Sequence, residues 1–264
     1  MLKIENVFKT FNPGTVNEKK ALRGLNLHLK PGEFVTVIGG NGAGKSTMLN
    51  CVAGVYGVEG GRILIDGVDV THLPEYKRAK FIGRVFQDPM MGTAATMQIE
   101  ENLALAARRG KPRTLRSGIT NKERDYYREQ LKILGLGLED RMTAKVGLLS
   151  GGQRQALTLL MATLQKPRLL LLDEHTAALD PKTAAKVLEA TERIVSKDNL
   201  TTMMITHNMR DAIAYGNRLI MMYDGHIVVD VSGEQKKNLT VEQLLNLFSQ
   251  ASGSDEVDDK LVLG

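Results

Sequence analysis

Length, composition and charge limit the classes of protein to which this chain can belong. It has 264 residues, 42% of them hydrophobic and 25% charged, which suits one large folded domain and excludes a disordered chain. No apolar run reaches the roughly 18–20 residues that a membrane-spanning helix needs, and the N-terminus lacks a signal-peptide pattern. The single cysteine, Cys51, cannot form an internal disulfide and fits a reducing compartment. We therefore expect a cytoplasmic protein.

The formal net charge of +5 comes from one segment. Residues 108–124 contain seven Lys or Arg and one Glu, so the rest of the chain is nearly neutral. A nucleic-acid-binding protein usually carries a broader basic surface. We therefore predict no nucleic-acid partner.

Strands dominate the first part of the chain. Residues 2–33 read as two strands around a polar turn at 12–19, with apolar and polar residues alternating between Leu25 and Leu29. Residues 34–38 form an apolar strand, which is followed by a glycine-rich turn and a helix from about Lys45. This strand-rich start predicts an antiparallel layer added to a main sheet.

Strands and helices alternate in the remainder. Further strands are predicted at residues 62–65, 83–86, 168–172, 202–206, 219–223 and 226–229. The pattern is helical between 97 and 135, interrupted by a basic stretch at 109–122, and helices are also predicted at 153–165, 182–196 and 241–250. Such alternation favours an α/β fold with a mainly parallel sheet. Residues 252–264 form an acidic tail that we expect to be mobile.

A phosphate-binding motif stands between the apolar strand and the helix that follows it. Residues 39–46 fit the pattern G-x-x-x-x-G-K-[ST] without a mismatch. Its glycines let backbone N–H groups converge on phosphate oxygens, and the helix adds the positive end of its dipole. Lys45 is predicted to bridge the β- and γ-phosphates of ATP, and Ser46 to bind Mg²⁺. The other predicted nucleotide contacts are Gly39, Asn41, Gly42, Ala43, Gly44 and Thr47. The alternative, a glycine-rich turn that binds nothing, is disfavoured by this strand-to-helix position.

Two carboxylates follow a second apolar strand. Four leucines, residues 169–172, lead into Asp173 and Glu174, as in a central strand of a parallel sheet. Ligands bind at the carboxyl ends of such strands, where the phosphate loop also emerges. Asp173 is predicted to bind Mg²⁺ through water, and Glu174 to act as general base on an attacking water. The alternative is an acid pair that caps the next helix.

The pentapeptide Leu-Ser-Gly-Gly-Gln at 149–153 reduces the number of phosphate-binding protein families to which the chain can belong. It opens a helix, so Ser150 and the glycine amides present a second anion-binding surface, although a serine alone there is an ordinary helix cap. Together with the phosphate loop and the acidic strand, it resembles the signature of ABC ATPases, and the resemblance covers residues 2–250. It implies that Ser150, Gly151, Gly152 and Gln153 contact ATP. It also implies one ABC ATPase domain at residues 1–251: a P-loop NTPase with an N-terminal antiparallel β layer and a helical subdomain at about 88–165.

Four further residues are similar to functional positions of that family. Gln87 resembles the Q-loop glutamine, which contacts Mg²⁺ and the attacking water, and Asp180 resembles the D-loop aspartate of the dimer interface. His207 resembles the switch histidine that holds the γ-phosphate, and Phe11 the aromatic that stacks on adenine. Gln87, His207 and Phe11 each have a structural alternative, which is a polar strand end, a structural histidine or a core aromatic, respectively. His175 and Ala177 differ from the residues usual at these positions in the family. Neither position carries a proposed catalytic group, so we expect a competent ATPase.

The resemblance also implies partners. In the family, each ATP lies between the phosphate loop of one subunit and the signature of the other. This implies a dimer of two copies around two ATP, driving separate permease subunits at the cytoplasmic face of the membrane. The basic residues 108–124 would contact permease loops or anionic lipid headgroups; the alternative is a solvated loop.

The sequence is similar to that of one bacterial branch of the family at residues 150–157, 173–180 and 206–209. Members of that branch work with substrate-binding proteins of tryptophan/tyrosine type. It implies uptake of a small solute such as an aromatic amino acid, with an extracellular substrate-binding protein as an indirect partner. The alternatives are an ATPase of an exporter or lipoprotein-release system and a soluble ABC ATPase without transport.

Overall fold

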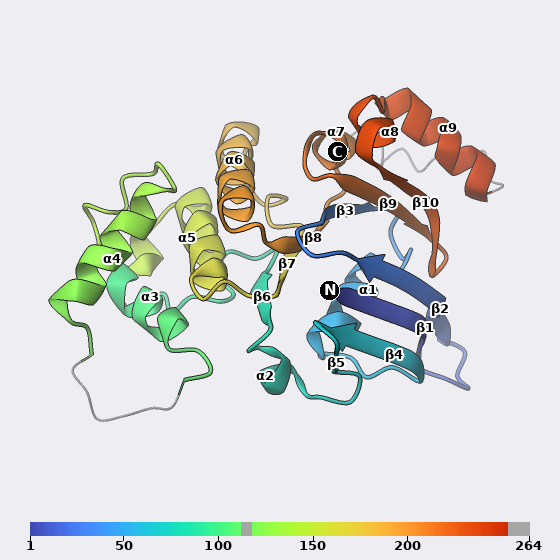
Figure 1. Ribbon diagram of the computed structural model, residues 1–264, viewed down its shortest axis with the longest axis horizontal. Helices are drawn as coiled ribbons and strands as arrows, with labels where there is room; N and C mark the ends of the chain where they lie inside the picture. The colour runs from blue at the N-terminus through green and yellow to red at the C-terminus, as the bar shows by residue number, and fades with distance from the viewer. Residues whose placement is uncertain (112–117, 253–264) are drawn as a thin grey trace.

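Two β-sheets flanked by helices form the structure, a computed structural model in which residues 1–111 and 118–252 are described (Figure 1). The larger sheet has the strand order β10-β9-β3-β8-β7-β6, and the smaller one β2-β1-β4-β5. The larger sheet comprises β3 (Phe34–Ile38), β6 (Ile82–Val85), β7 (Leu169–Asp173), β8 (Thr201–Ile205), β9 (Arg218–Tyr223) and β10 (His226–Ser232).

The larger sheet is parallel except at one edge. β3 pairs in parallel with β8 and β9, β7 with β8 and β6, and only β10 runs antiparallel, against β9. Its central strands are covered on both faces, and the four leucines of β7 are fully buried. The carboxyl ends of β3, β7 and β8 therefore lie at the same edge, where the predicted phosphate loop, acids and histidine follow them.

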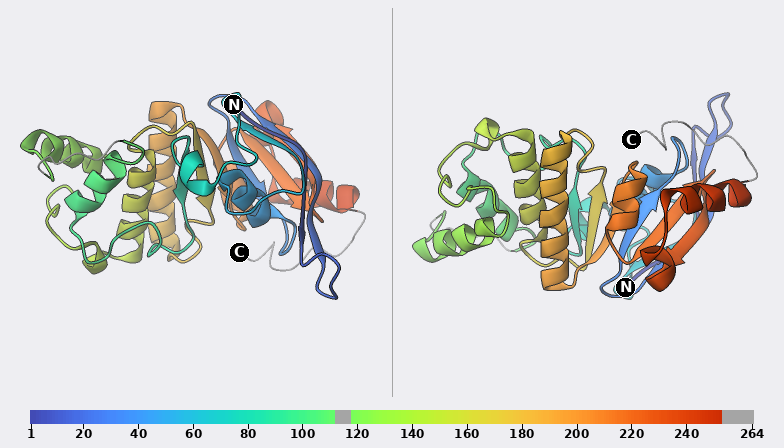
Figure 2. Two further views of the ribbon diagram at one scale, coloured as in Figure 1. Left: turned by 90° about the horizontal axis from the view of Figure 1, so that it is seen from below. Right: turned by 90° about the horizontal axis from the view of Figure 1, so that it is seen from above.

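The smaller sheet is the antiparallel layer predicted from the N-terminal strands. It comprises β1 (Leu2–Phe11), β2 (Lys19–Leu29), β4 (Gly60–Ile65) and β5 (Val68–Asp69). β1 and β2 pair with Leu2 opposite Leu29 and Phe11 opposite Lys19. Figure 2 shows that the turn between them projects from the body of the protein.

Helices cover the sheets and build a separate lobe. α1 (Lys45–Ala53) follows β3, and α5 (Gly151–Thr163) and α6 (Pro181–Asp198) pack side by side next to β6 and β7 (Figure 1). α3 (Ile99–Ala107) and α4 (Asn121–Lys132) pack beyond α5 and share its apolar core through Leu103, Tyr127 and Leu131. These helices lie within residues 88–165, and their status as a subdomain stays a prediction.

The sequence-based predictions missed the short elements. These are β5, α2 (Glu75–Arg78), the 3₁₀ turn Val146–Leu148, α7 (Met209–Ala214) and α8 (Gly233–Lys237). Segments of two to six residues are too short to repeat the hydrophobic period of a helix or strand, so the sequence pattern does not predict them. α9 (Val241–Ser252) extends through the first residue assigned to the tail. The expectation of a mobile acidic tail otherwise concerns residues 253–264, outside the described residues.

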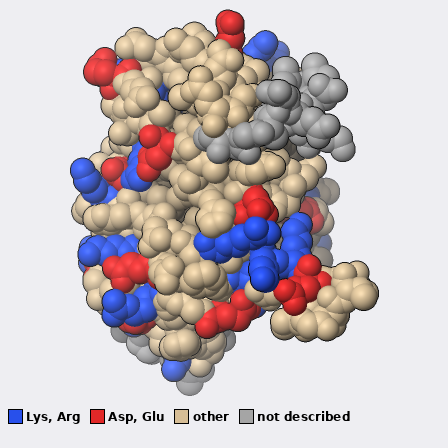
Figure 3. All heavy atoms as spheres, turned by 90° about the vertical axis from the view of Figure 1, so that its right-hand side faces the viewer, with Lys and Arg blue, Asp and Glu red and all other residues tan. Residues whose placement is uncertain are grey.

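The surface charge is mixed. On the face drawn in Figure 3, Lys and Arg side chains lie among Asp and Glu side chains. Ion pairs between oppositely charged side chains include Arg23 with Asp224 at 2.6 Å and Arg218 with Asp230 at 2.7 Å. Within residues 1–111 and 118–252, none of the helices has the length and apolar character required to cross a membrane.

Candidate functional site

The phosphate loop joins β3 to α1 in a conformation that needs glycine. Gly39 and Gly44 have φ angles of 147° and 104°. A Cβ on Gly39 would lie 2.3 Å from the Met222 carbonyl oxygen, and one on Gly44 would lie 2.6 Å from that of Ala21. Both glycines are therefore required by close backbone approach as well as by positive φ.

Lys45 is held inside this loop. It is 7% exposed, and its Nζ donates to the carbonyl oxygens of Gly39 at 2.6 Å and Gly40 at 3.1 Å. Burial lowers the pKa of Lys45, while the nearby carboxylates of Glu174 and Asp173 raise it. The loop thus encloses a cation whose opposing charges come from the neighbouring strand end.

A cavity of about 190 Å³ opens beside Lys45. It is lined by the loop residues Asn41, Gly42, Ala43, Gly44, Lys45, Ser46 and Thr47, and by Phe11, Lys19, Ala21 and Glu174. Phe11 packs edge-on against Tyr56 with ring centroids 5.2 Å apart, and Lys9 Nζ lies 5.4 Å from its ring. The structure therefore brings the predicted adenine-stacking aromatic and the predicted phosphate loop to one cavity.

The two predicted carboxylates lie at the end of β7. Glu174 has a φ of +44°, and its N–H donates to the Ile205 carbonyl at 3.0 Å, which ties the strand end to β8. Its Oε2 lies 3.6 Å from His207 Nδ1. Burial raises the pKa of Asp173, and Arg84 acts in the opposite direction. Glu174, His207 and Lys45 thus lie close together at or beside the cavity.

The residues near this cavity fit a magnesium ion held together with a nucleotide. Ser46 and Asp173 offer oxygen ligands, which Mg²⁺ prefers. No group of three or more His, Cys, Asp or Glu able to hold a metal is found among residues 1–111 and 118–252. A magnesium ion keeps several waters and binds through one or two protein oxygens and substrate phosphates, so a serine hydroxyl and one carboxylate supply enough protein ligands.

The Leu-Ser-Gly-Gly-Gln segment lies at the start of α5. Ser150 Oγ accepts from the Gln153 N–H at 3.3 Å, and Gln153 Oε1 accepts from the Ser150 N–H at 3.2 Å, a reciprocal cap. A Cβ on Gly152 would lie 1.9 Å from Thr183 Cγ2, so the glycine permits close approach of α5 to α6. Ser150 and Gly151 are exposed.

Asp180 lies beside this segment. It caps α6 by accepting from the Thr183 N–H at 3.1 Å, and it is exposed. Of the described residues, those that line the phosphate-loop cavity include neither Asp180 nor Ser150. One copy of the chain therefore presents its signature and its phosphate loop at separate places.

Gln87 is exposed in the segment that follows β6, and it too lies outside the described lining of that cavity. The sequence reasoning missed three residues near the site: Lys19, Tyr56 and Arg84. Arg84 had a signal that could have been used, because it is a charged residue within an otherwise apolar strand. Lys19 and Tyr56 reach the site only through tertiary packing.

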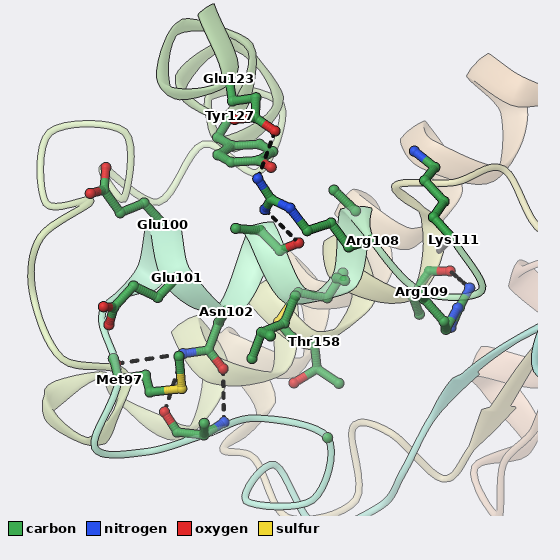
Figure 4. Close-up of a pocket in the computed structure, with 18 of the residues that line it drawn as sticks. Met97, Glu100, Glu101, Asn102, Arg108, Arg109, Lys111, Glu123, Tyr127 and Thr158 are labelled. Carbon is green, nitrogen blue, oxygen red and sulfur yellow. Dashed lines mark hydrogen bonds and ion pairs between the residues drawn. The ribbon is translucent and has the colours of Figure 1, made fainter. Parts of the chain in front are cut away.

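A second, larger cavity of about 2010 Å³ lies between the helical lobe and β6 (Figure 4). Arg108 at its wall pairs with Glu123 at 2.9 Å, and Arg124 pairs with Glu100 at 2.9 Å. Burial lowers the pKa of Arg109, whose Nη2 donates to the Ala162 carbonyl at 3.4 Å. Part of the predicted basic stretch is thus paired within the chain, while its residues 112–117 lie outside the described residues.

Comparisons with known proteins identify the family. The ABC transporter family model matches residues 22–177. A tyrosine transport ATP-binding protein of Clostridioides difficile (strain R20291) is 45% identical, over 95% of this chain and 100% of its own length. A phosphonates import ATP-binding protein of Lactococcus lactis subsp. cremoris (strain SK11) is 34% identical, over 87% of this chain and 92% of its own.

A solved structure shows the same fold. It is a dimeric, post-hydrolysis state of the ATP-binding cassette MJ0796 bound to ADP and Pi, with a TM-score of 0.74 and 32% identity, covering 88% of this chain and 98% of that one. The fold predicted from the sequence, a P-loop ABC ATPase with a mainly parallel sheet, is thereby confirmed. The chain belongs to the ABC transporter family, as an ATP-binding subunit that hydrolyses ATP with Mg²⁺ as cofactor.

Proposed function

We propose that the chain is the motor of an uptake transporter, in which two copies close around two ATP and drive separate permease subunits. The observation that carries this proposal is the separation of two half-sites in one chain. The phosphate-loop cavity lies beside α1, whereas Ser150 is exposed at the start of α5. Two copies arranged head to tail bring each signature to the other copy's cavity.

Each residue of the cavity has a distinct task in this proposal. The loop amides of residues 41–47 and Lys45 bind the phosphates, and Phe11 stacks on the adenine. Ser46 and Asp173 hold Mg²⁺ with Gln87, and the metal, when bound, neutralises charge on the transferred phosphoryl group. Lys45 exchanges its carbonyl partners for phosphate oxygens, which strengthens the interaction because the acceptor is then an anion instead of a neutral carbonyl.

Glu174 and His207 act on the attacking water and the terminal phosphate. Glu174 accepts the proton of the water as general base. His207 lies 3.6 Å from the Glu174 carboxylate and orients that carboxylate. It also donates a hydrogen bond to the γ-phosphate. The +44° φ of Glu174 directs the residue away from the strand path, and the bond to Ile205 holds this conformation.

ATP binding and hydrolysis alternately close and open the pair. Ser150, Gly151, Gly152 and Gln153 of one copy present a helix N-terminus to the phosphate bound by the other, with Asp180 at the interface. Shared contact with the terminal phosphate favours the closed pair, and its release removes that contact.

In this proposal the permease binds at the larger cavity, and the chain works at the cytoplasmic face of the membrane. Apolar residues on the cavity lining, such as Phe86, Leu105 and Met161, can accept an inserted loop. Lys111, which also lines the cavity and has no ion-pair partner among the described residues, can contact acidic residues or lipid headgroups.

An aromatic amino acid is the proposed solute. The relative from C. difficile is named for tyrosine transport, and an extracellular substrate-binding protein would deliver the solute to the permease. The test is ATP-driven movement of labelled tyrosine in vesicles that hold this chain and its permease, with the substrate-binding protein on the side opposite the ATP and Glu174→Gln as the inactive control. Accumulation on the side of the ATP supports uptake, whereas movement away from that side supports the exporter or lipoprotein-release alternative.

A further inference from the structure

An arginine that no motif predicts contacts the proposed magnesium-binding carboxylate. Arg84 lies in β6, which pairs in parallel with β7 so that Arg84 is opposite Leu171, close to the acidic end of the strand. Its terminal nitrogen Nη2 lies 3.5 Å from Asp173 Oδ2. The side chains are 14% and 17% exposed, so solvent screens this ion pair only partly.

Two further contacts hold the guanidinium in this position. The same Nη2 donates to Asn50 Oδ1 at 2.7 Å, and Asn50 lies on α1, the helix that begins with Lys45. The guanidinium carbon lies 4.5 Å from the centroid of the Phe86 ring, next to Gln87. Arg84 Nε is buried and has no hydrogen-bond partner in the described part of the chain. Arg84 therefore connects the phosphate-loop helix, the Asp173 carboxylate and the segment leading to Gln87.

The local charge balance shows what this contact does. Burial and the neighbouring Glu174 raise the pKa of Asp173, whereas Arg84 and Lys45 lower it. Lys45 is engaged by the loop carbonyls, so Arg84 is the positive group that contacts the carboxylate itself. A second cation approaching that carboxylate meets the repulsion of the guanidinium, whose Nη2 lies 3.5 Å from Oδ2.

We propose that Arg84 is an internal counter-ion of Asp173 that competes with Mg²⁺ for this carboxylate and so weakens magnesium binding by the ATP-bound subunit. The inference rests on the proposed role of Asp173 in holding Mg²⁺. Arg84 acts through Asp173 and is a positioning residue. Arg84 also contacts Asn50 on α1 and the Phe86 ring. When Asp173 binds Mg²⁺, the guanidinium loses one of its three contacts, and this changes how firmly β6, the strand before Gln87, is held.

The test compares Arg84→Met with Arg84→Lys and with Asn50→Ala in the full chain. Methionine keeps the length of the side chain and removes the charge, lysine keeps the charge, and Asn50→Ala removes the tether while leaving Arg84 in place. The first measurement is binding of a fluorescent ATP analogue in EDTA, followed by titration with Mg²⁺. The second is the unfolding midpoint in EDTA and in Mg²⁺.

We expect Arg84→Met to lower the half-saturating Mg²⁺ concentration about tenfold, because one repelling unit charge is lost from a partly buried site. Arg84→Lys and Asn50→Ala should stay within about threefold of the wild type, because each retains the positive charge. In EDTA the unfolding midpoint of Arg84→Met should fall, because Asp173 loses its partner, and Mg²⁺ should restore much of the difference.

An unchanged or higher half-saturating Mg²⁺ concentration in Arg84→Met overturns the proposal and makes Arg84 a structural or orienting group. Failure of the wild type to bind the analogue in EDTA or in Mg²⁺ is a different result, since it refutes the proposed nucleotide site. Binding of the analogue by all variants in EDTA shows that the phosphate loop is intact and keeps the two conclusions separate.

Discussion

Because His175 is buried, we expect the protein to lose a measurable part of its stability in mild acid. The His175 side chain is 1% exposed, and Nε2 lies 3.2 Å from Thr191 Oγ1 on α6. Nδ1 is buried without a partner among the described residues. Burial lowers the pKa of His175 from 6.5 to about 4. The folded protein therefore keeps a neutral imidazole at a pH where the unfolded chain binds a proton.

The size of the effect follows from this difference in pKa. Between pH 6.5 and 4 the unfolded state binds more protons than the folded state, so the free energy of unfolding falls as the pH falls. Each pKa unit corresponds to about 1.4 kcal/mol. Acidification from pH 7 to pH 5 should therefore cost about 2 kcal/mol through His175 alone.

The assay is urea unfolding of the wild type and of His175→Gln at pH 7 and pH 5. Glutamine retains an amide near Thr191 but does not titrate, while all other ionisable groups remain the same in both proteins. The wild type should lose about 2 kcal/mol more than the variant between the two pH values. Equal losses would show that His175 is not held neutral and would refute the reasoning from burial.

Three other substitutions test the site and its support. Gly39→Ala should reduce stability by at least about 2 kcal/mol and abolish ATP binding, because its Cβ would clash with the Met222 carbonyl; near-normal stability in chemical denaturation would contradict the loop geometry. Phe11→Ala should weaken ATP and ADP binding by about 1–3 kcal/mol, the usual worth of base stacking, but leave inorganic triphosphate binding unchanged in calorimetry; equal loss for all three ligands would reject stacking. Arg78→Met should reduce stability by about 3 kcal/mol, because the buried guanidinium donates to four backbone carbonyls; a loss under about 1 kcal/mol in urea unfolding would contradict that role.

The main architecture could be predicted because its strands are short, apolar runs followed by residues with special chemistry. Leucines 169–172 predicted a strand buried on both faces, and the two acids predicted its functional end. The glycines at 39 and 44 indicated a loop that needs unusual backbone angles, which the structure contains. Each of these features depends on a few consecutive residues, so it can be predicted from the sequence alone.

The remaining features depend on contacts between distant segments. Arg84 meets Asn50 across 34 positions and Asp173 across the β6–β7 pair, and no local pattern specifies either contact. The packing of Tyr56 on Phe11 and the approach of Gly152 to Thr183 also arise only in the folded chain. The short helices α2, α7 and α8 were missed because four to six residues cannot repeat the amphipathic period of a helix.

ATP-dependent association of Glu174→Gln tests the central claim most directly, because this variant should bind ATP without releasing phosphate. Light scattering should show monomers without nucleotide and dimers with Mg²⁺ and ATP, whereas Ser150→Arg added to the same variant should remain monomeric while still binding ATP. Persistence of Glu174→Gln as a monomer at saturating ATP, in the presence of its permease as well as alone, would contradict a site shared between two copies.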